Sequence, residues 1–375
     1  MTMKVLSSLP DLRQTRRLVI KVGSALLVEG KEARTDWLAT LATEIADLRR
    51  NSEVIVVSSG AIALGAAKLG LAKGGRGSLA DAQAAASVGQ VALARLWSDA
   101  LGTHGIAAAQ ILVTLGDLED RRRYLNASAT LARLLEAGAV PVVNENDSVA
   151  TEEIRFGDND RLAARVAQAA GADAVMLLSD VDGLYDRDPR ESGAKLVERV
   201  DGVTPEIIAM ASSASSSGLG SGGMLAKLQA ARIAERAGIT LAIVNGTHPS
   251  PISRALDSGT GTLFPAQADA SARKAWLGGR LAPSGVITVD LGCMTALENG
   301  ASVLAAGITG VEGAFARGDL VAIHGPNGER LGQGLVEYTS AECSAILGLR
   351  EEQQSAKLGY APRAAVIHRD HMVHA

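Results

Sequence analysis

Short apolar runs alternate with helical patterns along the first 265 residues of the chain. Each run is nearly all apolar, and Ala-rich amphipathic segments separate it from the next. Strands of this kind, without polar alternation, are typical of a parallel sheet whose two faces are both covered by helices. We therefore predict an α/β fold, an αβα sandwich around a mostly parallel sheet. Its expected strands are Leu18–Val22, Val54–Val57, Ala107–Val113, Val140–Val143, Val175–Leu178 and Leu241–Val244.

The pattern changes near Pro265. Residues 266–284 have the composition of a short helix and a linker, and after Gly285 short β runs follow one another between Gly and Asn-Gly turns. This change predicts a first domain over residues 1–265 and a separate small β-rich domain over residues 285–375. The strands expected in the second domain are Val286–Val289, Leu320–Ile323, Leu331–Val336 and Ala364–Ile367.

Composition argues against several classes of protein. A net charge of −4 with 3% aromatic residues provides neither the attraction nor the stacking surfaces typical of nucleic-acid binding. No apolar stretch is long enough to span a bilayer, and residues 1–17 lack the apolar run of a signal peptide. The two cysteines, Cys293 and Cys343, are too few for a disulfide framework. We therefore expect a cytoplasmic protein with no membrane partner.

A segment of small residues with one lysine leads into an apolar helical pattern. It consists of Ser221, Gly222, Gly223, Met224, Leu225, Ala226 and Lys227. Small residues let successive N–H groups turn toward an anion, the following helix adds its dipole, and Lys227 adds a full charge. We interpret the segment as a phosphate-binding loop, with a Gly-Ser linker as the alternative. The overlapping G-x-G-x-x-G at Gly218–Gly223 lacks the preceding strand of a dinucleotide site, and the chain has no P-loop pattern.

Polar residues follow four of the predicted strands. These are Gly23 and Ser24, Ser58–Gly60, Asn144–Asp147, and Ser179 with Asp180. The carboxyl ends of parallel strands meet at one edge of a sheet, and ligands bind there in such folds. Helix capping or turn chemistry would explain each cluster alone. Neither explains why all of them fall at the same edge.

Individual residues of these clusters have chemistry suited to an anionic substrate. Lys21 lies inside an apolar strand, where a charge is costly unless it meets an anion, so we expect it to point into the site rather than to water at a sheet edge. Ser59 and Gly60 precede a helical pattern over Ala61–Leu69, whose first N–H groups suit a carboxylate, although Ser59 would also fit a simple N-cap.

Two further clusters carry amide and carboxylate groups. Asp147 suits a substrate ammonium, while the amides of Asn144 and Asn146 suit a carboxylate. The segment Gly157–Asp160 begins another helix, and its acidic residues would orient lysines, bind magnesium or cap the helix.

Taken together, these motifs resemble the amino acid kinase family, and within it the bacterial enzymes that act on glutamate. The residues that carry the resemblance extend over nearly the whole chain: Val19–Ser24, Ser58–Gly65, Pro141–Asp147, Gly157–Asp160 and Gly218–Lys227. The tail resembles a PUA domain at Gly285–Asp290, Gly318-Asp319 and His368–Asp370.

The resemblance implies transfer of the γ-phosphoryl group of ATP to the side-chain carboxylate of L-glutamate, the first step of proline biosynthesis. It makes Lys21, Asp160 and Lys227 catalytic: the lysines would neutralise the phosphoryl oxygens and Asp160 would hold them in place. It assigns glutamate binding to Ser59, Gly60, Asn144, Asp147 and Asn159. It assigns ATP binding to Lys21, Ser179 and Asp180, and to every residue of the segment Ser221–Lys227. Mg²⁺ would bridge the β- and γ-phosphates without a protein ligand set, and no general base is needed because a carboxylate is already ionised at pH 7.

Other readings of the same motifs stay open. The family's scaffold also serves aspartate, acetylglutamate, carbamate and uridylate kinases, although the Asn144–Asp147 cluster favours a substrate with a free ammonium. The PUA-like tail permits RNA binding or RNA modification, against which the acidic balance argues. The resemblance also implies L-proline as a feedback inhibitor near Asp147, a homo-oligomer, and delivery of the product to glutamyl phosphate reductase.

Overall fold

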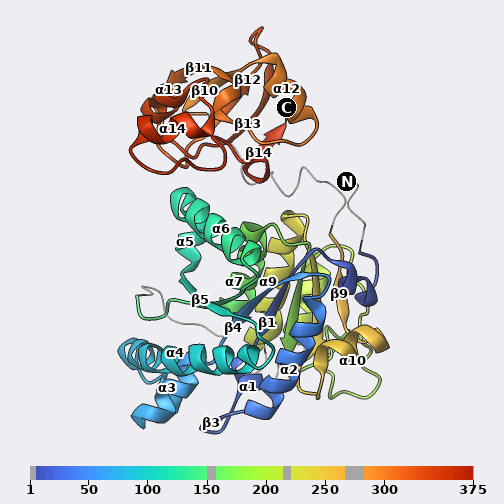
Figure 1. The fold of residues 1–375 in the computed structure, drawn as a ribbon. Helices are drawn as coiled ribbons and strands as arrows, with labels where there is room; N and C mark the ends of the chain where they lie inside the picture. Colours follow the sequence, from blue (N-terminus) through green and yellow to red (C-terminus); the bar gives the residue numbers. More distant parts are fainter. Residues whose placement is uncertain (1–5, 150–157, 214–220, 267–282, 375) are drawn as a thin grey trace. The chain divides into compact units, whose positions relative to one another are not determined.

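The structure is a computed structural model that describes residues 6–149, 158–213, 221–266 and 283–374. The chain divides into two compact units (Figure 1). The first unit comprises residues 1–118 and 127–268, and the second comprises residues 119–126 and 269–375. The second unit therefore includes eight residues, 119–126, that come from the middle of the chain. The predicted first domain, residues 1–265, includes residues 119–126, which the structure groups with the second unit. The domain boundaries at residues 265 and 285 stay a prediction.

A seven-stranded sheet forms the centre of the first unit, in the order β5-β6-β4-β1-β7-β8-β9. All six predicted strands are present: β1 (Arg17–Val22), β4 (Glu53–Ser58), β5 (Ala108–Val113), β6 (Val140–Glu145), β7 (Ala174–Ser179) and β8 (Thr240–Asn245). Neighbouring strands are parallel except β9 (Thr262–Phe264), which is antiparallel to β8. The prediction of a mostly parallel sheet is confirmed.

Helices cover both faces of this sheet, with α2 and α4 on one side and α7 and α9 on the other (Figure 1). The helices of the first unit and of its border with the second are α1 (Ser24–Leu27), α2 (Thr35–Leu48), α3 (Ala61–Leu69), α4 (Leu79–Gly102), α5 (Leu115–Glu119), α6 (Arg121–Glu136), α7 (Asp158–Ala170), α8 (Pro205–Ser213), α9 (Ser221–Arg236) and α10 (Pro251–Ser258). Short elements complete it: η1 (Leu9–Gln14), η2 (Ala72–Gly75), β2 (Val28–Glu29) and β3 (Glu32–Ala33). At 24 residues α4 is the longest described helix, and neither it nor any other described helix could cross a membrane.

One expectation for this unit is wrong. The segment from Ser221 to Ala226 is the first part of helix α9 rather than a loop. Met224, Leu225 and Ala226 are good helix formers, and Ala226 is buried, so packing extends the helix back to Ser221. The remainder of the expected loop, residues 214–220, lies outside the described residues. The helix α8, and not a strand, ends just before it, which agrees with the rejection of a dinucleotide fingerprint.

The second unit contains a five-stranded sheet in the order β11-β10-β12-β13-β14. Its elements are β10 (Gly285–Val289), α12 (Leu291–Glu298), η3 (Ala305–Gly307), β11 (Ile308–Gly313), β12 (Leu320–His324), β13 (Arg330–Leu335), α13 (Ser340–Ile346), α14 (Glu351–Leu358), η4 (Arg369–His371) and β14 (Met372–His374). Three of the four predicted strands are confirmed. The fourth, Ala364–Ile367, is wrong: Ala365, Val366 and Ile367 are buried, but only Ile367 forms a bridge, with Val303.

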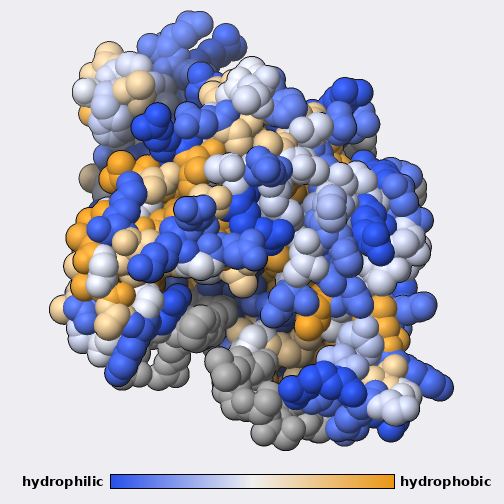
Figure 2. Space-filling model, turned by 90° about the horizontal axis from the view of Figure 1, so that it is seen from below, coloured by the Kyte–Doolittle hydropathy of each residue, from blue (hydrophilic) through white to orange (hydrophobic). Residues whose placement is uncertain are grey.

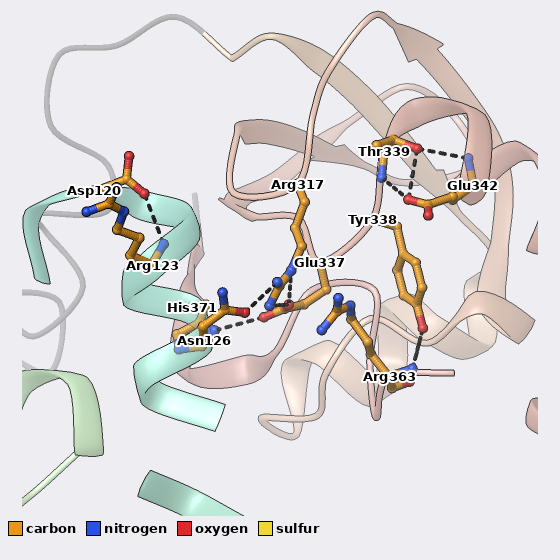
Figure 3. Close-up of polar contacts among 10 residues, drawn as sticks. All are labelled: Asp120, Arg123, Asn126, Arg317, Glu337, Tyr338, Thr339, Glu342, Arg363 and His371. Atoms are coloured by element: carbon orange, nitrogen blue, oxygen red, sulfur yellow. Dashed lines mark hydrogen bonds and ion pairs between the residues drawn. The ribbon is translucent and has the colours of Figure 1, made fainter. Parts of the chain in front are cut away.

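The beginning of α6 belongs to the second unit because specific contacts fix it there (Figure 3). The Arg317 guanidinium donates to Glu337 Oε2 at 3.0 and 3.1 Å and to Asn126 Oδ1 at 2.6 Å. The ring of Tyr124 meets His371 edge-on, with centroids 5.8 Å apart. Arg317 and Glu337 are largely buried, so each requires the other's charge. The second unit thus includes the first turns of a helix that continues into the first.

Helices α3 and α4 cross with their backbones in direct contact. A Cβ atom added to Gly65 would lie 1.8 Å from the carbonyl oxygen of Ala85, and one added to Gly89 would lie 1.7 Å from that of Ala61. Neither site has room for a methyl group, since the obstructing atoms are backbone. The two glycines therefore fix the distance between these helices.

We expect Gly65→Ala to destabilise the protein although alanine is the better helix former. The added methyl must push α3 and α4 apart, at a cost of roughly 2 kcal/mol or more in the free energy of unfolding. The matched control is Gly102→Ala, at the last residue of α4, where a Cβ atom would meet nothing within 4 Å. Thermal unfolding of the two variants is the measurement. A Gly65→Ala protein as stable as Gly102→Ala would contradict the observed crossing.

Candidate active site

The alternation of side chains in β1 directs one lysine into the site. Leu18, Ile20 and Val22 pack into the core that also contains α2 and α4. Side chains alternate between the two faces of a strand, so Lys21 points to the opposite face, toward α7 and α9. Lys21 is only 6% exposed. A lysine buried to this extent requires a nearby negative charge.

Asp160 supplies that charge and also binds a second lysine. Its Oδ1 atom lies 2.6 Å from Lys21 Nζ, and its Oδ2 atom accepts a hydrogen bond of 2.9 Å from Lys227 Nζ. Asp160 comes from the first turn of α7, and Lys227 comes from the second turn of α9. All three side chains are nearly inaccessible to solvent. The trio contains two positive charges and one negative charge, so its net charge suits an anion.

Burial and charge act in opposite directions on these groups. Burial lowers the pKa of the Lys21 ammonium, and Asp160 offsets only part of that effect. Burial raises the pKa of the Asp160 carboxyl, but the charges of Lys21 and Lys227 outweigh it and hold the pKa below its usual value. Asp160 is therefore ionised at neutral pH, and its charge helps to keep Lys21 protonated.

The trio lies on the wall of a cavity of about 230 Å³ at the carboxyl edge of the sheet. Ser179 and Asp180 at the end of β7 line it, and the hydroxyl of Ser179 donates to Asp180 Oδ1 at 3.2 Å. Gly23 and Gly223 line it as well, and neither presents a side chain there. This part of the cavity therefore combines backbone amides, a hydroxyl and two lysines, a set of groups suited to phosphates.

A chain of amide side chains forms the other wall. Asn159 Nδ2 donates to Ser59 Oγ at 2.6 Å and to Asn144 Oδ1 at 3.2 Å. Asn144 Nδ2 in turn donates to Gln90 Oε1 at 2.8 Å. Gln90 is next to Gly89 in α4, so the tight crossing of α3 and α4 also positions the end of this chain. These bonds hold the carboxamides of Asn144 and Asn159 in fixed orientations.

Two groups of this wall call for a positively charged ligand. The Oδ1 atom of Asn159 is buried and accepts no hydrogen bond from any residue that the structure describes. Asp147 places a carboxylate on the same cavity and is 8% exposed. A buried acceptor without a donor is costly, and a ligand ammonium would satisfy it.

The start of α3 presents its amides to the cavity without a capping side chain. Gly60 is the N-cap residue at φ 115°, a conformation that favours glycine, and no side chain in the described part of the chain bonds to the cap. Ser59 is therefore not an ordinary N-cap: its hydroxyl accepts from Asn159 instead. The first N–H groups of α3 remain available for an anion in the cavity.

Most residues singled out from the sequence meet at this one cavity. Its lining includes Lys21, Ser59, Gly60, Asn144, Asp147, Asn159, Asp160, Ser179, Asp180, Gly223 and Lys227. Met224, Leu225 and Ala226 are not among its lining residues, because α9 begins before them and directs Leu225 toward solvent. Ser221 and Gly222 begin that helix.

Sequence reasoning missed two residues of the site, Arg76 and Gln90. Arg76 lines the cavity from the segment between η2 and α4, and Gln90 bonds to Asn144 from within α4. Neither residue follows a predicted strand, so the polar clusters at the strand ends do not include them. The Gly-rich stretch before Arg76 was the only local sign of an unusual turn.

An αβα sandwich with two lysines on a shared carboxylate, beside a cavity at the carboxyl edge of its sheet, is typical of a phosphotransferase. The family model described as "Amino acid kinase family" matches residues 16–245, and the model described as "PUA domain" matches residues 285–355. The chain belongs to the amino acid kinase family.

Relatives with a named activity are similar over the whole chain. The glutamate 5-kinase of Novosphingobium aromaticivorans is 62% identical over 376 residues and covers 100% of both chains. That of Sphingopyxis alaskensis is 60% identical, over 95% of this chain and 97% of its own. Among solved structures, carbamate kinase from Giardia lamblia bound to AMP-PNP aligns with a TM-score of 0.50 at 16% identity, over 68% of this chain and 100% of its own. The last likeness shows a shared fold.

Removing the shared carboxylate should shift the pH dependence of the enzyme. In Asp160→Asn, Lys21 loses the charge that favours its protonated form, so its pKa falls further below the ordinary value. We expect kcat to drop on the order of a hundredfold and the loss of activity on the alkaline side to begin at lower pH.

The pH dependence of kcat is the measurement, with Asp257→Asn as the matched control. Asp257 forms an exposed ion pair with Arg13, so its loss should leave the profile unchanged. A folded Asp160→Asn enzyme with the wild-type alkaline limb would show that Asp160 does not sustain the charge of Lys21.

Proposed function

We propose that this chain phosphorylates the side-chain carboxylate of L-glutamate with ATP, giving L-glutamyl 5-phosphate in the first step of proline biosynthesis. The observation that carries the proposal is that one cavity holds both a pair of lysines suited to phosphate and oxygen atoms suited to an ammonium group. Lys21 and Lys227 share Asp160 on the cavity wall, and the same cavity is lined by the Asp147 carboxylate and by Asn159, whose Oδ1 atom accepts no hydrogen bond from a described residue. The identity to glutamate 5-kinases over the full chain supports the choice of substrate.

In the proposed reaction an oxygen of the γ-carboxylate attacks the γ-phosphorus of ATP. A new P–O bond forms to glutamate while the bond to the β-γ bridging oxygen breaks, and that oxygen leaves on ADP. The transferring phosphoryl group carries negative charge in the transition state, and Lys21 and Lys227 would stabilise that charge. Neither lysine has to move to do so, because Asp160 already holds both. The attacking carboxylate is ionised at neutral pH, so no residue has to remove a proton.

We propose that Mg²⁺ enters with ATP. Among the described residues no cluster of three or more His, Cys, Asp or Glu side chains forms a metal site. Both oxygens of Asp160 bind lysines, whereas Asp180 offers a carboxylate on the same cavity that suits a magnesium ion. When bound, the ion would neutralise phosphate charge that the two lysines do not reach.

Further features of the proposed function concern regulation and location. L-proline shares the α-carboxylate and the cationic amine of glutamate, so we propose that it inhibits at the Asp147 end of the cavity. Exposed apolar side chains on α3 and α4, namely Leu69, Leu79 and Val91, support assembly of a homo-oligomer. Figure 2 shows apolar residues gathered on that side of an otherwise hydrophilic face. We also propose delivery of the product to glutamyl phosphate reductase, and a cytoplasmic location on the basis of ATP use and two free buried cysteines.

Hydroxylamine trapping tests the proposed reaction, because it converts an acyl phosphate into a stable hydroxamate. The protein is incubated with ATP, Mg²⁺ and L-glutamate, and separately with L-aspartate and N-acetyl-L-glutamate. We expect hydroxamate with glutamate and little with the other two. Signal with aspartate or acetylglutamate but not with glutamate would overturn the substrate.

Asp147→Asn should separate the two substrates kinetically. The change removes the carboxylate proposed to bind the substrate ammonium and leaves the lysine end intact. We expect the KM for glutamate to rise by roughly thirtyfold or more, with the KM for ATP changed little. Initial rates with each substrate varied in turn give both constants. An equal rise in both would argue against a direct role for Asp147 in binding glutamate.

A further inference from the structure

We infer that Arg76 is a specificity-determining residue that binds the α-carboxylate of the substrate beside Asp147. The inference rests on the proposed function, because it assigns a role within the glutamate end of the same cavity. Arg76 lies outside the strand ends that carry the rest of the site, and it reaches the cavity from the segment that joins η2 to α4.

The backbone before Arg76 has a strained and fixed conformation. Lys73, Gly74 and Gly75 have φ values of 52°, 61° and 76°, so three consecutive residues occupy the left-handed region. Such a conformation is unfavourable for lysine and persists where surrounding structure imposes it. The turn is closed by a hydrogen bond of 3.3 Å from the Arg76 N–H to the carbonyl of Lys73.

Packing against α3 and α4 holds this turn in place. Gly75 is buried, and a Cβ atom there would lie 2.9 Å from the Cβ of Ala66 and 3.0 Å from that of Ala85. Immediately after Arg76, Ser78 caps α4 by accepting from the Asp81 N–H at 3.1 Å. Arg76 thus lies between Gly75, which packs against α3 and α4, and the capped start of α4, which itself packs on α3. Its Cα position is fixed relative to the amides of the substrate wall.

The charge of Arg76 interacts with Asp147, whereas the two lysines interact with Asp160. Among the described lining residues the basic ones are Lys21, Lys227 and Arg76, and the two lysines are bound to Asp160. Partial desolvation lowers the pKa of the Arg76 guanidinium, and the charge of Asp147 offsets part of this. Arginine remains charged at any physiological pH. Arg76 is also exposed, so an incoming ligand can reach it.

Arg76 and Asp147 together form a pair of opposite charges that matches an amino acid. An α-amino acid carries an ammonium and a carboxylate on adjacent atoms, so Asp147 can bind the first while Arg76 binds the second. A guanidinium can bind a carboxylate through two parallel hydrogen bonds, which fixes its orientation as well as its charge. The side-chain carboxylate then extends toward Lys21 and Lys227. This arrangement would select a free zwitterion over substrates that lack either charge.

The test compares L-glutamate with its α-amide, L-isoglutamine, which keeps the ammonium and the γ-carboxylate but has no charge at the α-carboxyl. Hydroxamate formation gives kcat and KM for both substrates. We expect Arg76→Gln to raise the KM for glutamate roughly thirtyfold or more, with kcat and the KM for ATP changed little. Its kcat/KM for isoglutamine should stay near the wild-type value, so that discrimination between the two substrates largely disappears. Arg76→Lys should recover part of the affinity for glutamate, since it restores the charge without the two-bond geometry.

Lys73→Asn is the matched control, since it removes one positive charge from the same turn and asparagine tolerates a positive φ. We expect wild-type kinetics from this variant. Equal losses with glutamate and isoglutamine in both Arg76→Gln and Arg76→Lys would overturn the inference, because they would indicate damage to the turn rather than loss of a carboxylate contact. A wild-type protein that forms no hydroxamate with glutamate would instead overturn the proposed function, and with it the ligand assigned to Arg76.

Discussion

A single buried carboxylate, Asp160, determines how the catalytic end of this protein is built. It pairs with Lys21 from β1 and with Lys227 from α9, two residues separated by more than half of the chain. None of the three could be buried alone, because an isolated charge in the interior costs several kcal/mol. The requirement to pair them fixes the position of α7 between β1 and α9. It also leaves one positive charge in excess beside a cavity, the condition needed to hold a transferring phosphoryl group.

The other end of the cavity depends on backbone packing more than on charge. The glycines Gly65 and Gly89 bring α3 and α4 into contact, and this pair of helices supports the parts that face the substrate. Gly60 begins α3, Gln90 extends from α4 to Asn144, and the turn before Arg76 is held between the two helices. A methyl group in the crossing would therefore disturb the binding wall as well as the stability. The two parts of the cavity meet at the first turn of α7, where Asn159 of the amide chain directly precedes Asp160 of the trio.

The sequence was most informative where hydrophobic pattern and strand ends coincide. Six of the seven strands of the large sheet are predicted from the sequence, because strands buried on both faces leave a continuous apolar signature; the short antiparallel strand β9 is not among them. The bounds of α3 also match the predicted helix. The Gly-Ser content of Ser221–Gly223 predicts a loop, whereas the helix formers Met224–Ala226 extend α9 back to Ser221. Ala364–Ile367 is as apolar as a strand but forms irregular chain, in which the last three residues are buried and Ile367 bridges to Val303. Arg76 and Gln90 escaped notice because only the packing of α3 on α4 directs them to the cavity. Local pattern does not record such a contact.

The role of the two lysines is tested most directly by single-turnover measurements on Lys21→Ala and Lys227→Ala, with circular dichroism to establish that each variant is folded. With enzyme in excess over ATP and at saturating glutamate, the observed rate reports phosphoryl transfer without product release. We expect each substitution to lower that rate on the order of a hundredfold or more, because each removes charge stabilisation that is strongest in the transition state. A folded variant of either lysine that transfers phosphate at nearly the wild-type rate would contradict the assignment of the Lys21, Asp160 and Lys227 trio to catalysis.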